Sequence, residues 1–544
     1  MSTVITMANA KDMSVQYVQE DNTQDNGAPE DFTGTVRFTD KDRVFLIPTP
    51  SADPRGTYSS HDFYPLNLPK WRKVLFVIIV SLFSCAAGSM VSGFGSLLAF
   101  YRPKYIKAGA DVATISGLVA YPTIFQGLGN LIFIPVANAI GRRPVFLLVC
   151  LIAILGGVIA SRSTTLEVHL AGRMVLGLGA GLGEALPPMM VSEIHFLHER
   201  STALMWQSGI QAIGAAVFVL CASPIAYAIQ PENWYMVLIA VLSLVFLSAV
   251  FFLPESKYHR HLATEHDDTD PVNNISSKQA PALLTLEDRP TFDLINYKPR
   301  TLHSDMNLFV NAPEWKGIPE TLIRMTKVFF FPTVLWAFVL NGTALGAMIS
   351  ISATQATVLL APPYSWSSSS ISYVNAGQIV VGIIAIPLLG YGSDFMIKWR
   401  ARRNGGIHEP ESRLIPLVIP LSMGIIALLV YGAAAQYSGK IHWGALIFAV
   451  PADFFSFVGI NIATITYLLD SFPTAEHGPI LILITAVRGF VGFGFSYSVT
   501  QFVSTAGYLG CFGTYAGLNL FLGVLGVIIF LTGKSLRDFQ ARFL

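Results

Sequence analysis

The chain has 544 residues, of which 52% are hydrophobic and only 13% are charged, and its mean hydropathy is +0.54. Because soluble domains carry about 25% charged residues, this composition excludes a disordered scaffold, a secreted disulfide module and an ordinary soluble enzyme. The formal net charge of +1 offers no attraction along a polyanion, so we expect no nucleic-acid partner.

Twelve apolar runs follow the polar start of the chain, and each is long enough to form a membrane-spanning helix of about 20 residues. The runs begin at Val74, Val112, Pro144, Val168, Thr202 and Trp234 and, after a gap, at Val328, Ile371, Leu414, His442, Pro479 and Gly513. This arrangement predicts an all-α membrane protein with twelve transmembrane helices in two six-helix bundles.

The polar segments beside the runs define the predicted regions of the chain. We expect a disordered cytosolic tail at 1–70, a first bundle at 71–258, a cytosolic linker at 259–326, a second bundle at 327–536 and a cytosolic tail at 537–544. The N-terminal region lacks a basic start before a short apolar stretch, so we expect no cleavable signal peptide.

Lysine and arginine residues beside the runs predict the orientation of the helices. Fourteen of them flank the runs on the side that carries both termini, and five lie in the loops of the opposite side. These five are Arg102, Lys104, Lys107, Arg162 and Lys440. Because basic residues are retained on the cytoplasmic side, we predict a multi-pass protein of the cell membrane with both termini in the cytoplasm.

The two halves of the chain carry similar loops at the same position. Arg142 and Arg143 follow Gly141 directly after the second run, and Asp394 follows the eighth run, shortly before a basic cluster at 398–403. Similar halves about an axis along the membrane normal are typical of transporters that bind their substrate between the halves.

Several of these motifs resemble signatures of the major facilitator superfamily, and in particular of its fungal twelve-span drug:proton antiporters. The loop at 141–143 resembles the signature between spans 2 and 3, and Arg173 with Gly177 and Gly181 resembles the signature of span 4. The stretch 401–414 is similar to one found in a fungal subgroup that includes polyamine and cation carriers as well as drug exporters. The resemblance implies the major facilitator fold and transport by alternating access.

The resemblance also implies roles for particular residues. Arg142, Arg143 and Asp394 would act in gating at the cytoplasmic ends of the spans, with simple charge anchoring as the alternative. Spans 1, 4, 7 and 10 would line a central cavity. Asn341 and Gln355 of span 7 would there join a carboxylate from span 4 and another from span 10.

Four charged residues lie well inside the apolar runs, namely Arg173, Glu184, Asp453 and Arg488. A charge at mid-bilayer costs about 2.5–3.5 kcal/mol on the insertion scale, so each should face a cavity or a partner. We interpret Arg173 and Arg488 as structural intramembrane charges. We expect Arg173 and Glu184 to share one face of their helix, because eleven residues make three turns plus about 20°.

Asp453 and Glu184 are the candidate residues for binding protons or substrate. Asp453 lies beside Phe454 and Phe455, where a carboxyl group can exchange a proton or bind a cation against aromatic faces. The alternative for Asp453 is an ion pair with Arg488, which lies at a similar depth in the next span. The alternative for Glu184 is a hydrogen bond at a tight helix contact. The resemblance implies that the two carboxylates face each other across the cavity.

Together these features predict a proton-coupled secondary transporter that exports a drug, toxin or secondary metabolite across a fungal plasma membrane. The alternatives are a proton-coupled importer of polyamines or other cationic nutrients, and a receptor that binds a ligand without transporting it. The expected partners are a small-molecule substrate, protons and the lipid bilayer, and we expect a monomer. No phosphate-binding loop, His-Glu-x-x-His or Cys-x-x-Cys motif occurs, so we expect no ATP hydrolysis, metal, cofactor or enzymatic activity.

Overall fold

A computed structural model describes residues 39–40, 43–44, 68–195, 197–257, 307, 313–384, 388, 392, 410–472 and 474–542. The predicted N-terminal tail and most of the predicted linker lie largely outside these residues, and so does Asp394. Outside the membrane-spanning region, two short strands, β1 (Thr39–Asp40) and β2 (Arg43–Val44), pair antiparallel.

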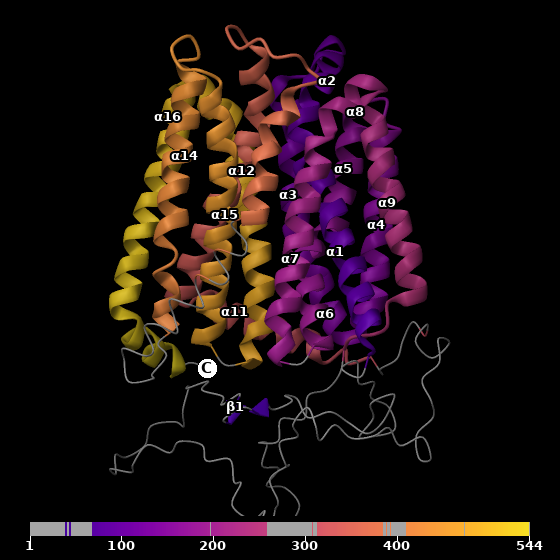
Figure 1. Cartoon of the computed structure of the whole chain (residues 1–544), viewed down its shortest axis with the longest axis vertical. Helices are drawn as coiled ribbons and strands as arrows, with labels where there is room; N and C mark the ends of the chain where they lie inside the picture. The colour runs from indigo at the N-terminus through magenta and orange to yellow at the C-terminus, as the bar shows by residue number, and fades with distance from the viewer. Residues whose placement is uncertain are drawn as a thin grey trace, which may run out of the picture. The chain divides into compact units, whose positions relative to one another are not determined.

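Helices make up nearly all of the rest of the described chain. The first half forms α1 (Lys70–Ser92), α2 (Phe94–Lys107), α3 (Val112–Ile140), α4 (Arg142–Ser161), α5 (Leu166–Ala180), η2 (Gly181–Gly183), α6 (Leu186–Ile194), α7 (Leu197–Leu220), α8 (Ala222–Ala228) and α9 (Pro231–Phe252). The second half forms α11 (Gly317–Phe329), α12 (Pro332–Leu360), η3 (Ile371–Asn375), η4 (Pro410–Leu414), α14 (Val418–Gln436), α15 (Gly444–Ser471) and α16 (Thr474–Ala541). Figure 1 shows the two sets side by side, in indigo to magenta and in orange to yellow. We call the end at which α9 ends and α12 begins the linker end, and the opposite end, which carries α2 and α8, the distal end.

The described helices account for eleven of the twelve predicted spans and for part of the eighth. Ten helical stretches of the described chain are long and apolar enough to cross a membrane. One of them, Glu476–Gln540, contains two helices, and the shorter apolar helix Ile371–Ile384 lies where the eighth span is predicted. The ten stretches, the second helix of the double one and the shorter helix make twelve segments in the predicted order. The prediction of an all-α multi-pass membrane fold is confirmed.

The turn between the last two segments depends on a glycine. Gly507 has a φ of 72°, in the left-handed region that residues with a side chain rarely adopt, and it interrupts α16. Oε1 of Gln436 accepts a hydrogen bond from the backbone N–H of Tyr508 (2.9 Å), which caps the break. The end of α14 and both parts of α16 are thereby joined at the distal end.

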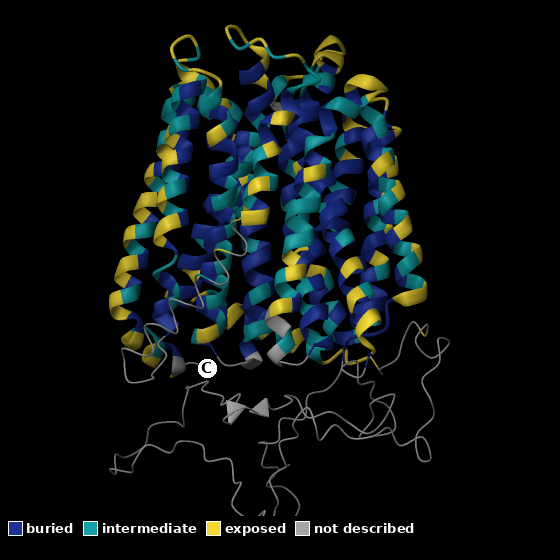
Figure 2. Cartoon of the chain, viewed as in Figure 1, coloured by how far each residue is buried: buried dark blue, intermediate teal, exposed yellow. Residues whose placement is uncertain are grey.

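Apolar side chains are exposed along the outward faces of the helices, whereas those between the helices are buried (Figure 2). The exposed large apolar residues of α4, α9 and α16 include Leu151, Leu155, Leu244, Leu247, Val524, Val527 and Leu531. A soluble monomer rarely exposes apolar patches of this extent, so these faces are the lipid-contacting surface.

The two halves meet along α3 and α16. Gly127 of α3 and Gly489 of α16 face each other, and a Cβ atom at Gly489 would lie 2.9 Å from the Cα atom of Gly127. Tyr121 packs against the rings of Phe493 and Tyr497, with centroids 5.6 and 6.1 Å apart. Small residues flanked by aromatic ones therefore bring the two backbones into direct contact.

Part of the predicted linker is helical. Within α11, Met325 and Val328 are buried on one face, while Arg324 forms an ion pair with Glu476 at the start of α16 (3.3 Å). This helix is amphipathic and shorter than a membrane span, so its sequence contains no long apolar run and it was not predicted. At the other end of the second half, α16 continues to Ala541, five residues beyond the predicted boundary.

Candidate substrate and proton site

The fourth span is broken at Glu184. Helices α5 and α6 are separated there by the short 3-10 turn η2. Pro187 and Pro188 lack the N–H groups that would bond to the carbonyl oxygens of Gly183 and Glu184, so a regular α-helix cannot pass this point. The expectation that Arg173 and Glu184 share one face of a continuous helix is therefore wrong.

Arg173 points into the first half of the protein. Its guanidinium donates hydrogen bonds to the carbonyl oxygens of Met90 (3.0 Å), Val91 (3.1 Å) and Leu118 and to the hydroxyl of Tyr235 (2.9 Å). The first two carbonyls lie where α1 passes into α2. Arg173 is fully buried and ties α5 to α1, α3 and α9.

The glycines that follow Arg173 allow close contact with α3. A Cβ atom at Gly177 would collide with the carbonyl group of Pro122, and one at Gly181 would collide with that of Gln126. Small residues let another helix backbone come near, and here that helix is α3 of the same half. The stripe and Glu184 therefore face different partners.

Glu184 reaches the second half, where it forms an ion pair with Arg488 of α16. The Arg488 side chain is 4% exposed and the Glu184 side chain is 42% exposed. Arg488 also donates a hydrogen bond to Oδ1 of Asn461 (3.3 Å) and lies 5.5 Å from the ring centre of Phe457, both on α15. One ion pair thus connects the broken fourth span to two helices of the second half.

Asp453 lies on α15 two turns from Asn461, toward the distal end. Asp453 is 4% exposed, and its Oδ2 atom has no hydrogen-bond partner among the described residues. Asp453, Phe457 and Asn461 are four residues apart and follow one face of the helix. An ion pair between Asp453 and Arg488 was the alternative, but Arg488 is paired with Glu184 instead.

Asn341 and Gln355 lie on α12 at different depths. Nδ2 of Asn341 donates a hydrogen bond to Oγ1 of Thr464 on α15 (2.6 Å), and Nε2 of Gln355 donates one to Oγ of Ser96 on α2 (3.1 Å). Asp453 is eleven residues, about 16 Å, from Thr464 toward the distal end, and Gln355 is fourteen residues, about 21 Å, from Asn341 in the same direction. Asp453 and Gln355 therefore lie at a similar depth, while Asn341 lies nearer the linker end.

Three of these side chains carry a buried oxygen atom that accepts no hydrogen bond within the described residues. They are Oδ2 of Asp453, Oδ1 of Asn341 and Oε1 of Gln355. Buried acceptors without a donor are costly, and a protonated amine, a hydroxyl group or a proton would satisfy them.

Among the residues that the structure describes, side-chain hydrogen bonds between the two halves gather toward the distal end. They join Arg102 to Thr357 (2.7 Å), Gln355 to Ser96 (3.1 Å), Ser352 to the carbonyl of Ser92 (3.3 Å), Thr500 to Ser116 (3.1 Å) and Ser372 to the carbonyl of Leu220 (2.6 Å). The Glu184–Arg488 pair lies deeper than these contacts. These hydrogen bonds therefore join the two halves at the distal end, in addition to the α3–α16 contact.

Arg142 and Arg143 belong to a charged cluster at the linker end. The Arg142 guanidinium bonds to Oε1 of Glu193 (3.0 Å), whose second oxygen accepts a hydrogen bond from the Ser256 hydroxyl (2.6 Å). The Glu255 carboxylate accepts hydrogen bonds from the backbone N–H groups of Arg142 (2.8 Å) and Arg143 (3.2 Å). The cluster fastens α4, α6 and the segment after α9 to one another within the first half.

Glu193 and Glu255 were not among the predicted site residues. The signal for Glu255 is its place directly after the sixth apolar run, since a charge there ends a span. Burial raises the pKa of Glu255, while the N–H donors and Arg142 act in the opposite direction. Asp394, the predicted counterpart in the second half, lies outside the described residues.

His195 directly follows α6 at the same end of the protein. Its Nδ1 atom lies 2.8 Å from the carbonyl oxygen of Val191. Burial lowers the pKa of His195, and Lys73 lowers it further, against the effect of this hydrogen bond. His195 is therefore neutral at physiological pH.

No group of three His, Cys, Asp or Glu side chains within the described chain is placed to hold a metal ion. The arrangement offers reversible binding instead. Within the described residues it combines an Asp453 oxygen without a donor, the Glu184–Arg488 ion pair between the halves and two buried amide oxygens. Such a set can exchange a proton or bind a donor-bearing solute.

Comparison with known proteins finds membrane transporters. A sequence profile of the Major Facilitator Superfamily matches residues 74–497. The chain is 23% identical over 476 residues to the multidrug transporter TPO1_2 of Candida glabrata, covering 85% of this chain and 74% of that protein. It is 22% identical over 489 residues to the efflux pump radE of Floropilus chiversii, covering 87% and 82%. The fold is similar to that of the human organic anion transporter MFSD10, with a TM-score of 0.54 and 14% identity over 84% of this chain and all of that one.

Proposed function

The chain belongs to the Major Facilitator Superfamily, and on that premise we propose that it is a proton-coupled secondary transporter that exports small organic molecules across the plasma membrane of a fungal cell. The observation that carries this proposal is Asp453, a buried carboxyl group whose Oδ2 atom has no partner among the described residues. An ionised carboxylate in this position is expensive, and taking up a proton or a cation relieves the cost.

Arg488 offers a route by which protonation is coupled to movement. The guanidinium lies 5.5 Å from the ring centre of Phe457, and Asp453 lies four residues farther along the same face of α15, about 6 Å away along the axis. Ionised Asp453 would draw Arg488 toward the distal end and release Glu184, whereas protonated Asp453 would leave Arg488 on Glu184. Because the Glu184–Arg488 pair joins the two halves, the proton on Asp453 would bias which state is populated.

The unpartnered oxygens favour a substrate that donates hydrogen bonds. Asp453 and Gln355 lie at a similar depth, and each offers a buried acceptor. An amphipathic molecule with an amine or hydroxyl group would satisfy these acceptors, with its apolar part against aromatic side chains. Protons and such a substrate would then compete for Asp453, which is a basis for antiport.

The direction of flux rests on the relatives. The names of TPO1_2, a multidrug transporter, and radE, an efflux pump, support export. The alternative is proton-coupled import of polyamines or other cationic nutrients, which the acidic, donor-poor site also supports. The sign of net flux separates the two functions.

The experiment uses proteoliposomes made with the parent protein, Asp453→Asn or Asp470→Asn. Asp470 lies on the same helix but pairs with Arg413 near the linker end, so its substitution is a matched control. A panel of organic cations, polyamines and fungal metabolites is followed under opposite pH gradients. We expect some compounds to move against the proton gradient with the parent and Asp470→Asn proteins, and a loss of this pH-dependent movement with Asp453→Asn. Unchanged transport by Asp453→Asn would contradict the proposal.

A further inference from the structure

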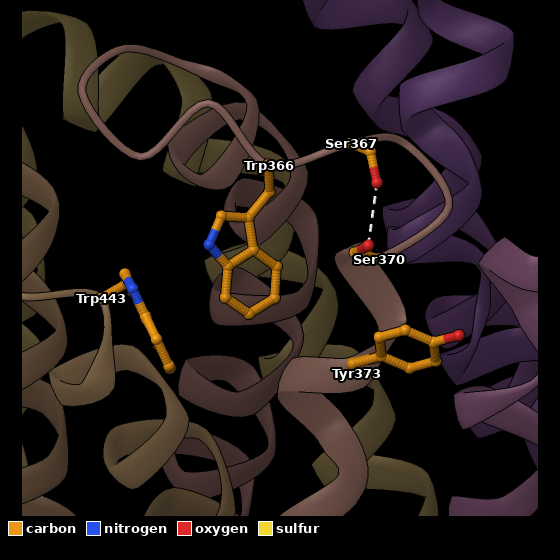
Figure 3. A pocket seen from close by; sticks show the side chains of 5 residues that line it. All are labelled: Trp366, Ser367, Ser370, Tyr373 and Trp443. Atoms are coloured by element: carbon orange, nitrogen blue, oxygen red, sulfur yellow. Dashed lines mark hydrogen bonds between the residues drawn. The ribbon is translucent and has the colours of Figure 1, made fainter.

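A separate cavity of about 360 Å³ opens at the distal end of the second half. Its walls are Trp366, Ser367, Ser370, Tyr373 and Trp443, as Figure 3 shows. The cavity is wide open to the outside, so a bound solute would lie partly exposed. The cavity lies outside the group formed by Asp453 and the Glu184–Arg488 pair.

The two indoles are held by contacts of the loop that follows α12. The backbone N–H of Trp366 donates to the carbonyl oxygen of Leu359 (2.9 Å), and the Tyr364 hydroxyl lies within 3.0 Å of the carbonyl oxygen of Ala434. The rings of Trp366 and Trp443 pack edge to face with centroids 5.7 Å apart and an angle of 69° between them. The aromatic wall is thus fastened to the ends of α12 and α14.

The cavity adjoins elements that connect to the first half and to Asp453. Ser372, next to the wall residue Tyr373, donates a hydrogen bond to the carbonyl oxygen of Leu220 on α7 (2.6 Å). Trp443 directly precedes α15, and Asp453 lies ten residues later, about 15 Å along the axis.

The chemistry of the wall selects by charge. Two indole rings, one phenol ring and two serine hydroxyls line the cavity, and these lining residues include no ionised side chain. The hydroxyls of Ser367 and Ser370 bond to each other (2.8 Å). The quadrupole of an aromatic ring makes its face partially negative, so the face attracts cations and disfavours anions.

We propose that the Trp366–Trp443 cavity is a binding site for flat or quaternary organic ammonium cations. A role of this site in transport rests on the proposed function, whereas binding of the cation does not. The same chemistry is offered by a free organic cation and by the choline headgroup of a membrane lipid. Both sources place a weakly hydrated cation against the indole faces.

The test measures binding of N-methylquinolinium to the purified full chain in a maltoside detergent, with naphthoate as an anion of similar shape. We expect the cation to bind and the anion not to bind. Trp443→Ala should weaken binding by about 5- to 30-fold, and Trp443→Phe, which keeps an aromatic face, by less. Trp315→Ala, at an exposed tryptophan near α11, is the matched control and should leave affinity unchanged.

Ser370→Lys provides a second test that keeps both indoles in place. A lysine ammonium in the wall should repel the cation and abolish binding. Each measurement is repeated in Asp453→Asn protein, which isolates the cavity from the carboxylate. No cation binding, equal binding of naphthoate, or unchanged affinity in both Trp443→Ala and Ser370→Lys would overturn the proposal.

A lipid arm distinguishes the two sources of the cation. The same measurement is made with added phosphatidylcholine and with added phosphatidylglycerol. Competition by the choline lipid alone supports the site with a lipid headgroup as its occupant, and absence of competition supports it with a free cation. If the parent protein shows no pH-dependent transport, the proposed function is overturned, but cation binding to the cavity can still be measured. Failure of the proposed function is therefore distinguishable from failure of the proposed binding site.

Discussion

Replacing Glu184 by Gln removes the counter-ion of Arg488, so the ion pair between the two halves is lost. Arg488 would keep only the oxygen of Asn461 as a polar partner among the contacts given above, in a position where its side chain is 4% exposed. Replacing Arg488 by Gln is milder, because the Glu184 side chain is 42% exposed and can be hydrated. The two single substitutions are therefore expected to be unequal, with Glu184→Gln the more destabilising.

The size of the coupling follows from charge and exposure. Two unit charges 4 Å apart interact by about 4 kcal/mol at an effective dielectric constant of 20. Water reaches the exposed part of Glu184 and screens the pair, so we expect about 1–3 kcal/mol of coupling. Leaving Arg488 buried without its partner adds a penalty that the double variant does not have.

The assay is a double-mutant cycle on the thermal midpoint of the purified protein. The loss of Tm in the double variant should be smaller than the sum of the single losses, by about 2–6 °C. Additive losses, or a larger loss for Arg488→Gln than for Glu184→Gln, would refute the reasoning that this pair holds the halves together.

Three further predictions concern packing and the linker end. Gly177→Ala should lower the Tm because its Cβ atom meets the Pro122 carbonyl, whereas Gly513→Ala, with open space around it, should be neutral or gain up to about 1 kcal/mol from helix propensity. Glu255→Ala should cost about 1–3 kcal/mol for each buried N–H left without an acceptor, checked by thermal unfolding against the parent. The pKa of His195 is lower in the folded state than in the unfolded state, where it is about 6.5, so neutral His195 stabilises the fold above that pH and this stabilisation is lost as the pH falls. His195→Gln should therefore make the decline of Tm between about pH 7 and pH 5 less steep.

The positions of the twelve spans followed from hydropathy alone, because each helix must bury its backbone polar groups in lipid and needs a long apolar run to do so. Close packing at Gly177 and Gly181 was also predictable, since small residues four apart expose a strip of backbone. These features depend on local sequence, which is why one chain without its relatives was enough to find them.

The arrangement of the charged residues was less predictable. The break at Glu184 had a visible signal in Pro187 and Pro188, but the helical-face argument assumed a continuous span. Arg488 had two carboxylates within plausible reach, and only the packing of the two halves decides that it meets Glu184. The helix α11 is apolar on one face only, so its mean hydropathy is too low to predict a membrane span.

Proton movement driven by a substrate gradient reports directly on whether Asp453 carries the coupled proton. Proteoliposomes that contain a trapped pH indicator receive an outward or inward substrate gradient with no imposed pH gradient. We expect the parent and Asp470→Asn proteins to move protons in the direction opposite to the substrate. We expect the Asp453→Asn protein to move no protons. Substrate flux without proton movement in the parent, or undiminished proton movement in Asp453→Asn, would contradict Asp453 as the proton-binding residue.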